Sequence, residues 1–123
     1  MAELIAVIDD DESVRDSVKG LLRAAGYRVM TFESAEIFLE SGAATGTSCL
    51  ILDVRMPGID GPELQVRLQE GNARVPIIFI TAHEDGRVRE RVLRAGAVDV
   101  LSKPFMPNVL LSTVQVALGE EAR

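Results

Sequence analysis

The chain has 123 residues and a formal net charge of −6; 47% of its residues are hydrophobic and 26% are charged. This length supports one hydrophobic core, so residues 1–123 are expected to form a single domain, and the composition excludes disordered and fibrous proteins. The acidic balance argues against direct binding of nucleic acid, because a protein that grips a phosphate backbone needs clustered Lys and Arg.

Five short apolar runs, rich in β-branched residues, predict five β-strands. They cover residues 4–8, 28–32, 49–52, 77–80 and 99–101. Most of these runs are continuous rather than alternating, which is typical of strands in a parallel sheet whose two faces are both covered by helices. The pattern therefore indicates a sheet in the middle of the domain.

Amphipathic segments that follow these runs predict five helices. The first has an apolar stripe over residues 14–25 and stops at Gly26; the others cover residues 34–39, 62–68, 88–95 and 107–118. Most of their boundaries are marked by a glycine after the last apolar residue or by a proline in the first turn. Strands and helices therefore alternate along the whole chain.

The spacing of the strands predicts the fold class. Their midpoints, Ala6, Met30, Ile51, Phe79 and Val100, are separated by 24, 21, 28 and 21 residues, which is the spacing of repeated βα units. Right-handed crossovers leave few arrangements of five parallel strands, and the commonest at this length has the order 2-1-3-4-5. We therefore expect an α/β fold, a flavodoxin-like doubly wound (βα)5 unit with a five-stranded parallel sheet.

Polar residues cluster where the predicted strands end. They are Asp9, Asp10 and Asp11 after the first strand, Asp53 after the third, Thr81 after the fourth and Lys103 after the fifth. Because an open parallel sheet binds ligands at the carboxyl ends of its strands, we expect these side chains to share one crevice. Asp11 is expected to cap the following helix instead of binding a ligand.

The chemistry of this crevice favours phosphoryl transfer with a divalent cation. Grouped carboxylates repel one another unless a cation lies among them, and oxygen ligands in a partly open site suit Mg²⁺, with Mn²⁺ as a substitute. Asp53 is the candidate nucleophile, which would form an aspartyl phosphate. Lys103, the hydroxyl of Thr81 and the backbone N–H of Ala82 are expected to stabilise the phosphoryl oxygens.

Four motifs carry a resemblance to a known family. They are Ile-Asp-Asp at 8–10, Leu-Asp-Val-Arg-Met-Pro-Gly at 52–58, Ile-Thr-Ala at 80–82 and Lys-Pro-Phe at 103–105. In this order they resemble the receiver domain (CheY-like) of two-component response regulators, over essentially the whole chain. Gly-Ala-Val-Asp at 96–99 also resembles the FixJ/LuxR-type subfamily, whose receivers control a helix-turn-helix output domain.

The resemblance implies roles for individual residues. Asp9, Asp10, Asp53 and the backbone carbonyl of Arg55 would bind Mg²⁺, and a sensor histidine kinase would phosphorylate Asp53. Thr81 and Lys103 would then sense the phosphoryl group, and the Lys103–Pro104 peptide bond is expected to be cis.

Two further positions that flank the phosphoryl group in this family, Arg55 and His83, would tune the rate of dephosphorylation. For His83 the sequence favours a solvated loop residue over an acid–base role, since a lone histidine needs an orienting partner for such chemistry.

One position departs from the family pattern. Val100 stands three residues before Lys103, where these receivers usually carry an aromatic side chain, and a β-branched valine has little freedom to change rotamer. We hypothesise that phosphorylation still repacks the face formed by the fourth helix, fifth strand and fifth helix, through backbone shifts in residues 81–84. That change would control dimerisation or an output domain, which for this subfamily is transcriptional.

The fourth predicted helix is basic within an acidic protein. Its arginines are Arg87, Arg89, Arg91 and Arg94. They form either a solvated face or a surface that pairs with acids of a second copy or of an output domain. A DNA-binding domain C-terminal to these residues is an expected partner.

Two other functions stay open from the sequence. One is a receiver-like interaction module that works without phosphate, which Val100 favours and the intact acidic and lysine positions oppose. The other is a Mg²⁺-dependent phosphohydrolase, for which we find neither a cap domain nor a second general acid after Asp53. We therefore expect a protein that catalyses only its own phosphorylation and dephosphorylation, and no wider enzymatic activity.

The sequence also predicts the cellular setting. The apolar run nearest the N-terminus, residues 4–8, is too short for a signal peptide, and no run approaches the roughly 20 apolar residues that cross a bilayer. The lone cysteine, Cys49, lies in an apolar run and is expected to be a buried thiol. We expect a cytoplasmic protein without membrane contact.

Overall fold

A computed structural model describes residues 3–120. Its strands are β1 (Leu4–Ile8), β2 (Arg28–Phe32), β3 (Cys49–Asp53), β4 (Ile77–Thr81) and β5 (Asp99–Ser102). All neighbouring pairs are parallel, and the order across the sheet is β2-β1-β3-β4-β5. The predicted α/β class and the 2-1-3-4-5 topology are confirmed.

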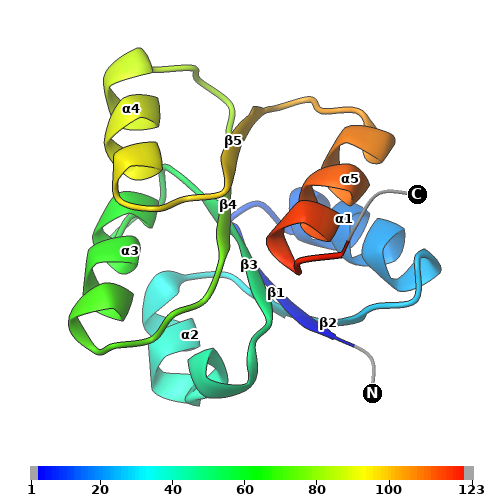
Figure 1. Ribbon diagram of the computed structural model, residues 1–123, viewed down its shortest axis with the longest axis horizontal. Helices are drawn as coiled ribbons and strands as arrows, with labels where there is room; N and C mark the ends of the chain where they lie inside the picture. Colours follow the sequence, from blue (N-terminus) through cyan, green and yellow to red (C-terminus); the bar gives the residue numbers. More distant parts are fainter. Residues whose placement is uncertain (1–2, 121–123) are drawn as a thin grey trace.

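Helices cover both faces of this sheet, as Figure 1 shows. They are α1 (Glu12–Ala24), α2 (Ala35–Ser41), α3 (Gly61–Glu70), α4 (Gly86–Arg94) and α5 (Pro107–Ala117), with a short 3-10 turn, η1 (Ala43–Gly46), after α2. α1 and α5 lie on one face, and α2, α3 and α4 lie on the other (Figure 1). None of the helices in residues 3–120 has the length and apolar character that a membrane span requires.

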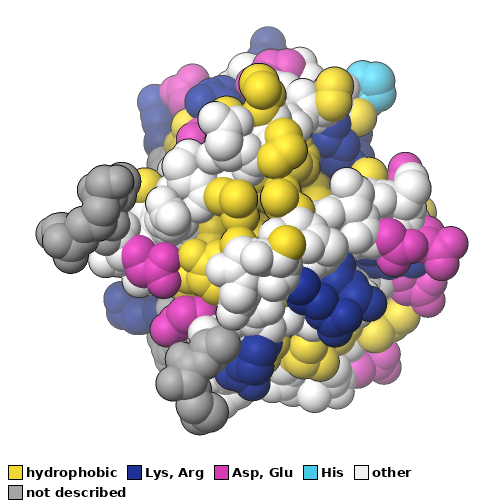
Figure 2. Space-filling model, turned by 90° about the vertical axis from the view of Figure 1, so that its right-hand side faces the viewer, with side chains coloured by type: hydrophobic (Ala, Val, Ile, Leu, Met, Phe, Trp, Pro, Cys, Tyr) yellow, Lys and Arg dark blue, Asp and Glu magenta, His cyan; other side chains and the backbone are white. Residues whose placement is uncertain are grey.

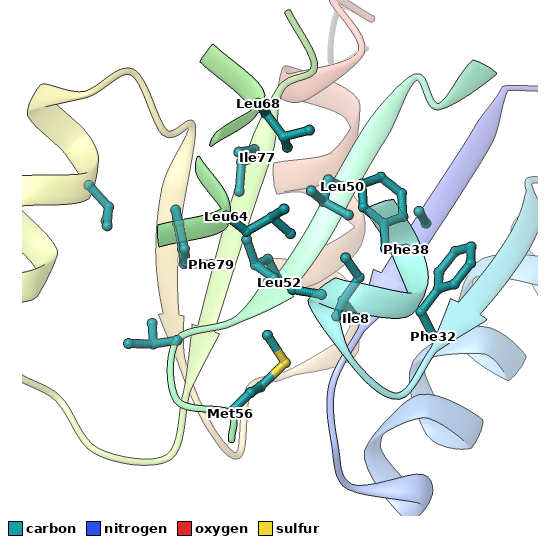
Figure 3. Close-up of a cluster of buried hydrophobic side chains, with 14 of the residues drawn as sticks. Ile8, Phe32, Phe38, Leu50, Leu52, Met56, Leu64, Leu68, Ile77 and Phe79 are labelled. Carbon is teal, nitrogen blue, oxygen red and sulfur yellow. The ribbon is translucent and has the colours of Figure 1, made fainter. Parts of the chain in front are cut away.

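The core consists of two apolar layers, one on each face of the sheet. On the α2–α4 face, Phe38 and Leu64 pack with Leu50, Leu52 and other strand residues (Figure 3). On the α1–α5 face, the strand residues that point the other way pack with buried residues of α1 and α5. All five residues of β3 are buried, which explains why its apolar run is continuous instead of alternating.

The predicted buried cysteine is confirmed. Cys49 begins β3 with no exposed surface, in the layer under α1 and α5. Burial raises the pKa of its thiol to about 12, so it is a neutral hydrophobic side chain at physiological pH.

The predicted ends of three strands were one residue too short. β3, β4 and β5 include Asp53, Thr81 and Ser102, which the apolar pattern had left outside. Backbone pairing continues past the last apolar side chain, with Asp53 opposite Ile80 and Thr81 opposite Ser102. The polar side chains are therefore held by rigid strand ends.

Side chains cap the starts of α1, α2, α3 and α4, whereas α5 begins at Pro107 without a side-chain cap. The side chain of Asp11 accepts a hydrogen bond from the Ser13 N–H at 2.9 Å and caps α1, as predicted. Asp85 caps α4 through the Arg87 N–H, so α4 begins at Gly86, two residues before the predicted position. The sequence prediction for α4 was late because it relied on the first apolar residue.

Candidate functional site

The loops that follow β1, β3, β4 and β5 surround an open cleft of about 300 Å³ at the carboxyl edge of the sheet. The residues that line it are Asp9, Asp10, Asp11, Asp53, Arg55, Thr81, Ala82, His83 and Lys103. Every side chain predicted to share a crevice is therefore present in it. Val100 lies outside, buried in the layer under α2, α3 and α4.

Three carboxylates meet at the centre of this cleft. Asp9, Asp10 and Asp53 each place a carboxylate oxygen within 4.8 Å of the others. Asp9 is fully buried and Asp53 is 5% exposed, whereas Asp10 is open to solvent. Burial, followed by repulsion from Asp9, raises the pKa of Asp53 to about 7. The cluster can hold a metal ion, whose charge would relieve this repulsion.

Lys103 supplies a cation beside two of these acids. Its ammonium lies 2.9 Å from Oδ2 of Asp9 and 3.6 Å from Oδ1 of Asp53. Burial on its own would lower the pKa of this ammonium, but the hydrogen bond to Asp9 and the attraction of Asp53 outweigh it and raise the pKa. Lys103 is therefore charged at neutral pH, and it points at the carboxylate of the proposed nucleophile.

The backbone after β1 is held by hydrogen bonds that place Asp9. The Asp11 N–H donates to Oδ1 of Asp9 at 2.9 Å, and the guanidinium of Arg15 donates to the carbonyl oxygen of Asp9 at 2.7 Å. Sequence reasoning missed Arg15, although its position one turn into α1 places it over the preceding strand end.

Thr81 is engaged with its own loop. Its hydroxyl donates to the carbonyl oxygen of His83 at 2.8 Å and accepts from the His83 N–H at 3.1 Å. Any new partner in the cleft must therefore compete with His83 for the hydroxyl proton. The next two side chains, Ala82 and His83, are exposed.

A network of polar contacts joins this loop to α4 and β5. Arg89 of α4 donates to the carbonyl oxygen of Val100 at 2.9 Å and lies 3.5 Å from carboxylate oxygens of Glu84 and Asp99. The hydroxyl of Ser102 donates to Glu84. None of these connections is visible in sequence, because they link residues 5 to 18 positions apart that share no pattern.

Close packing also fixes the start of α3 against Asp53. A Cβ atom at Gly61 would lie 2.5 Å from the carbonyl oxygen of Asp53 and 2.9 Å from the ring of Phe79. Only glycine fits there, so α3 begins directly behind the strand end that carries Asp53. The peptide bond between Lys103 and Pro104 is cis, as predicted.

A second cleft, of about 410 Å³, lies at the opposite edge of the sheet around Arg74 and Pro76. Its lining contains no carboxylate, histidine, cysteine or hydroxyl side chain. The chemistry of the described residues is therefore concentrated at the carboxyl edge.

Comparison with known proteins agrees with this geometry. The family model of the response regulator receiver domain matches residues 5–115. Nodulation protein W of Bradyrhizobium diazoefficiens is 45% identical over 120 residues, which cover 98% of this chain and 53% of that protein. The transcriptional regulatory protein FixJ of the same organism is 40% identical over 116 residues, which cover 94% of this chain and 57% of FixJ.

A solved structure agrees as well. The response regulator StyR superposes with a TM-score of 0.90 at 43% identity, with 97% of this chain and 60% of that chain covered. The chain spans about half the length of the curated relatives it matches. The family match, these identities and the acidic cleft lead to one conclusion: the chain belongs to the response regulator receiver domain family of two-component signal transduction.

Proposed function

We propose that this receiver accepts a phosphoryl group on Asp53 from a sensor histidine kinase, with Mg²⁺ bound by Asp9, Asp10, Asp53 and the carbonyl of Arg55. The observation that carries the proposal is the position of Asp53, a nearly buried carboxylate between two acids and the ammonium of Lys103. A nucleophile that must attack a polyanionic donor needs compensating positive charge at this place.

The donor set fits a hard divalent cation. It consists of oxygen atoms alone, one of the acids is open to solvent, and burial followed by repulsion from Asp9 raises the pKa of Asp53. When bound, Mg²⁺ supplies positive charge that neutralises the carboxylates and the phosphoryl oxygens. Mn²⁺ would substitute, since it accepts the same ligands.

The chemical step requires little beyond positioning. A carboxylate oxygen of Asp53 forms a bond to phosphorus while the bond from phosphorus to the donor breaks, and the leaving group keeps the bonding electron pair. Lys103 stabilises charge on the phosphoryl oxygens, and the hydroxyl of Thr81 and the N–H of Ala82 donate to them. Arg55 and His83 line the same cleft and would tune the approach of water to the aspartyl phosphate.

Transmission to the α4–β5–α5 face follows from the contacts of Thr81. If its hydroxyl turns to the phosphoryl group, the hydrogen bond to the carbonyl oxygen of His83 is lost. The neighbouring Glu84 contacts both Ser102 and Arg89, so movement of this loop reaches β5 and α4. Because Val100 is buried and β-branched, this backbone route replaces the flip of an aromatic side chain.

A surface beside the cleft suits docking of the kinase. A mainly apolar hollow of about 470 Å³ lies between α1 and the loop before α5, with Val14, Pro104 and Phe105 among its lining residues. Figure 2, which looks onto the side of α1 and α5, shows hydrophobic side chains gathered in a band across this face. Lys103 belongs to both this hollow and the acidic cleft, so a partner seated here lies next to Asp53.

The output is proposed to be transcriptional and to lie in a DNA-binding domain C-terminal to these residues, with homodimerisation as an intermediate step. This rests on relatives such as FixJ, named as a transcriptional regulatory protein, of which the match covers 57%. Under this proposal the protein works in the cytoplasm, and its only chemistry is its own phosphorylation and dephosphorylation.

The test is intact mass after incubation with acetyl phosphate, with and without Mg²⁺. We expect the parent to gain one phosphoryl group only with Mg²⁺, Asp53→Asn to gain none, and Asp16→Asn to behave like the parent, because Asp16 is exposed on α1. The absence of any gain in the parent would refute the proposal. It would favour a phosphate-independent interaction module, the reading that Val100 supports.

A further inference from the structure

Glu36, in the first turn of α2, reaches across to the loop that follows Asp53. Its Oε2 accepts a hydrogen bond from the backbone N–H of Ile59 at 3.1 Å, between residues 23 positions apart in the chain. Ile59 belongs to the segment 54–60, which connects β3 to α3 and contains Arg55, whose carbonyl is a proposed metal ligand. Glu36 therefore contacts the site loop without lying in the cleft.

The loop is shaped to receive this carboxylate. Gly58 has a φ of +75°, and a Cβ atom at this position would overlap Oε2 of Glu36. Glycine thus supplies both the left-handed turn and the space that brings the Ile59 N–H to the carboxylate. The hydrogen bond depends on the fit of two segments.

The contact is costly for stability. The second oxygen, Oε1, is buried, and within residues 3–120 it has no hydrogen-bond partner. A buried, half-satisfied carboxylate destabilises a fold relative to an apolar or fully hydrogen-bonded side chain. A role in general stability is therefore a poor explanation for Glu36.

The segment is otherwise tied mainly at its ends. The Val54 N–H donates to the carbonyl oxygen of Ile80 at 3.0 Å, and the Gly61 N–H donates to the carbonyl oxygen of Val54 at 3.0 Å. Met56 anchors the middle by burying its side chain. Between Met56 and Gly61, the hydrogen bond from Ile59 to Glu36 is the contact that ties the loop to α2.

From these contacts we propose that Glu36 is a positioning residue, which holds the β3–α3 loop so that the carbonyl of Arg55 faces the acidic cluster. The inference rests on the proposed function, because it assumes that this carbonyl binds the cation. Outer-shell partners of this kind orient ligands that they do not replace, and their loss typically weakens metal binding by about 10- to 100-fold.

The experiment compares Mg²⁺ binding by calorimetry in the parent, Glu36→Ala, Glu36→Gln and Glu40→Ala. We expect Glu36→Ala to bind Mg²⁺ about tenfold more weakly. Glu36→Gln retains the parent affinity, because its amide oxygen still accepts from Ile59. Glu40→Ala is the matched control, since Glu40 is exposed on the same helix.

Two further measurements complement this one: the first needs no metal, and the second changes Gly58 instead of Glu36. Hydrogen exchange on the metal-free protein should show faster exchange of the Ile59 amide in Glu36→Ala but not in Glu36→Gln. Gly58→Ala should also weaken Mg²⁺ binding, because the new methyl group displaces the carboxylate. Adding Glu36→Ala to Gly58→Ala should cost little more, since both remove the same contact.

The outcomes separate this inference from the proposed function. A parent that binds no Mg²⁺ overturns the proposed function and this inference with it. A parent that binds Mg²⁺, with equal affinity in Glu36→Ala, overturns the positioning role alone, even where exchange at Ile59 is faster.

Discussion

The surroundings of Asp53 disfavour its charged form in two ways. This residue is nearly buried, and it lies beside two other acids with which it is proposed to bind a cation; both conditions penalise its charge. The pKa of about 7 reflects both effects, with burial as the larger cause and repulsion from Asp9 as the next. The residue is therefore held in an unfavourable state until a cation arrives.

Removing the charge of Asp53 should stabilise the metal-free protein in a pH-dependent way. The folded-state pKa of about 7 exceeds the usual 3.8, so the unfolded chain loses its proton first as pH rises. The stability contributed by the neutral form is complete below about pH 4 and is lost as pH rises through about 7. Asp53→Asn should gain about 4 kcal/mol at pH 8, since the pKa is raised from 3.8 to about 7 and one pKa unit is about 1.4 kcal/mol.

Thermal unfolding followed by circular dichroism, in EDTA from pH 4 to pH 8, measures this difference. The gap between Asp53→Asn and the parent should narrow as pH falls and be small at pH 4, close to the usual pKa of 3.8 below which Asp53 is protonated in both states. Saturating Mg²⁺ should also reduce it at pH 8. A gap that stays constant across this range would show that the effect is not electrostatic.

At the residue scale, the sequence predicted which side chains line the cleft but not which residues position them. Asp9, Asp53, Thr81 and Lys103 could be predicted because each ends or directly follows a strand, and the ends of parallel strands share one edge. The supporting contacts could not be predicted in this way. Glu36 reaches Ile59 across 23 residues, and such a contact leaves no periodic signal in the sequence.

Among the five α-helices, α4 has the fewest buried residues. Val92 is its one fully buried residue, and its hydrophobic neighbours are partly exposed. Arg89 compensates by bonding the carbonyl oxygen of Val100 on the edge strand β5 and by its contacts with Glu84 and Asp99. Polar contacts of this kind can be exchanged with a small change in free energy, which suits an element that moves in a switch.

Arg89→Ala should disconnect the site loop from α4 and β5. The loss of one hydrogen bond and two half-exposed ion pairs should cost about 1 kcal/mol in the free energy of unfolding. In NMR spectra with beryllofluoride and Mg²⁺, chemical-shift changes should spread from residues 81–84 into α4 and β5 in the parent but stop near residue 84 in the variant. Glu90→Ala is the control, since Glu90 is exposed on the same helix. Equal spread in Arg89→Ala would eliminate the proposed route.

The molecule as a whole consists of a rigid apolar frame and a polar edge at which the proposed switch acts. The five strands (Figure 1) and the two apolar layers, one of which is drawn in Figure 3, fix the positions of the strand ends. The polar groups lie beyond them at one edge. The spacing of apolar runs was sufficient to predict this frame, because right-handed crossovers restrict the order of the strands. It was insufficient at the strand ends, where backbone pairing extends into Asp53, Thr81 and Ser102.

Charge distribution over the whole molecule leads to the last prediction. Two copies with a formal net charge of −6 repel each other, so a phosphorylation-dependent dimer needs a local surface of opposite charge. The exposed arginines of α4 supply one, including Arg87 and Arg91. Sedimentation velocity with beryllofluoride and Mg²⁺ should therefore show a dimer that weakens as salt rises from 50 to 500 mM. Salt screens the attraction between exposed charges, and at 0.1 M this attraction falls off over about 10 Å.

Arg91→Glu should remain monomeric while still gaining a phosphoryl group from acetyl phosphate, which separates the interface from the chemistry. A dimer that persists in Arg91→Glu would place the contact elsewhere, and a parent that stays monomeric under all conditions would mean that the α4 face serves an output domain instead of a second copy.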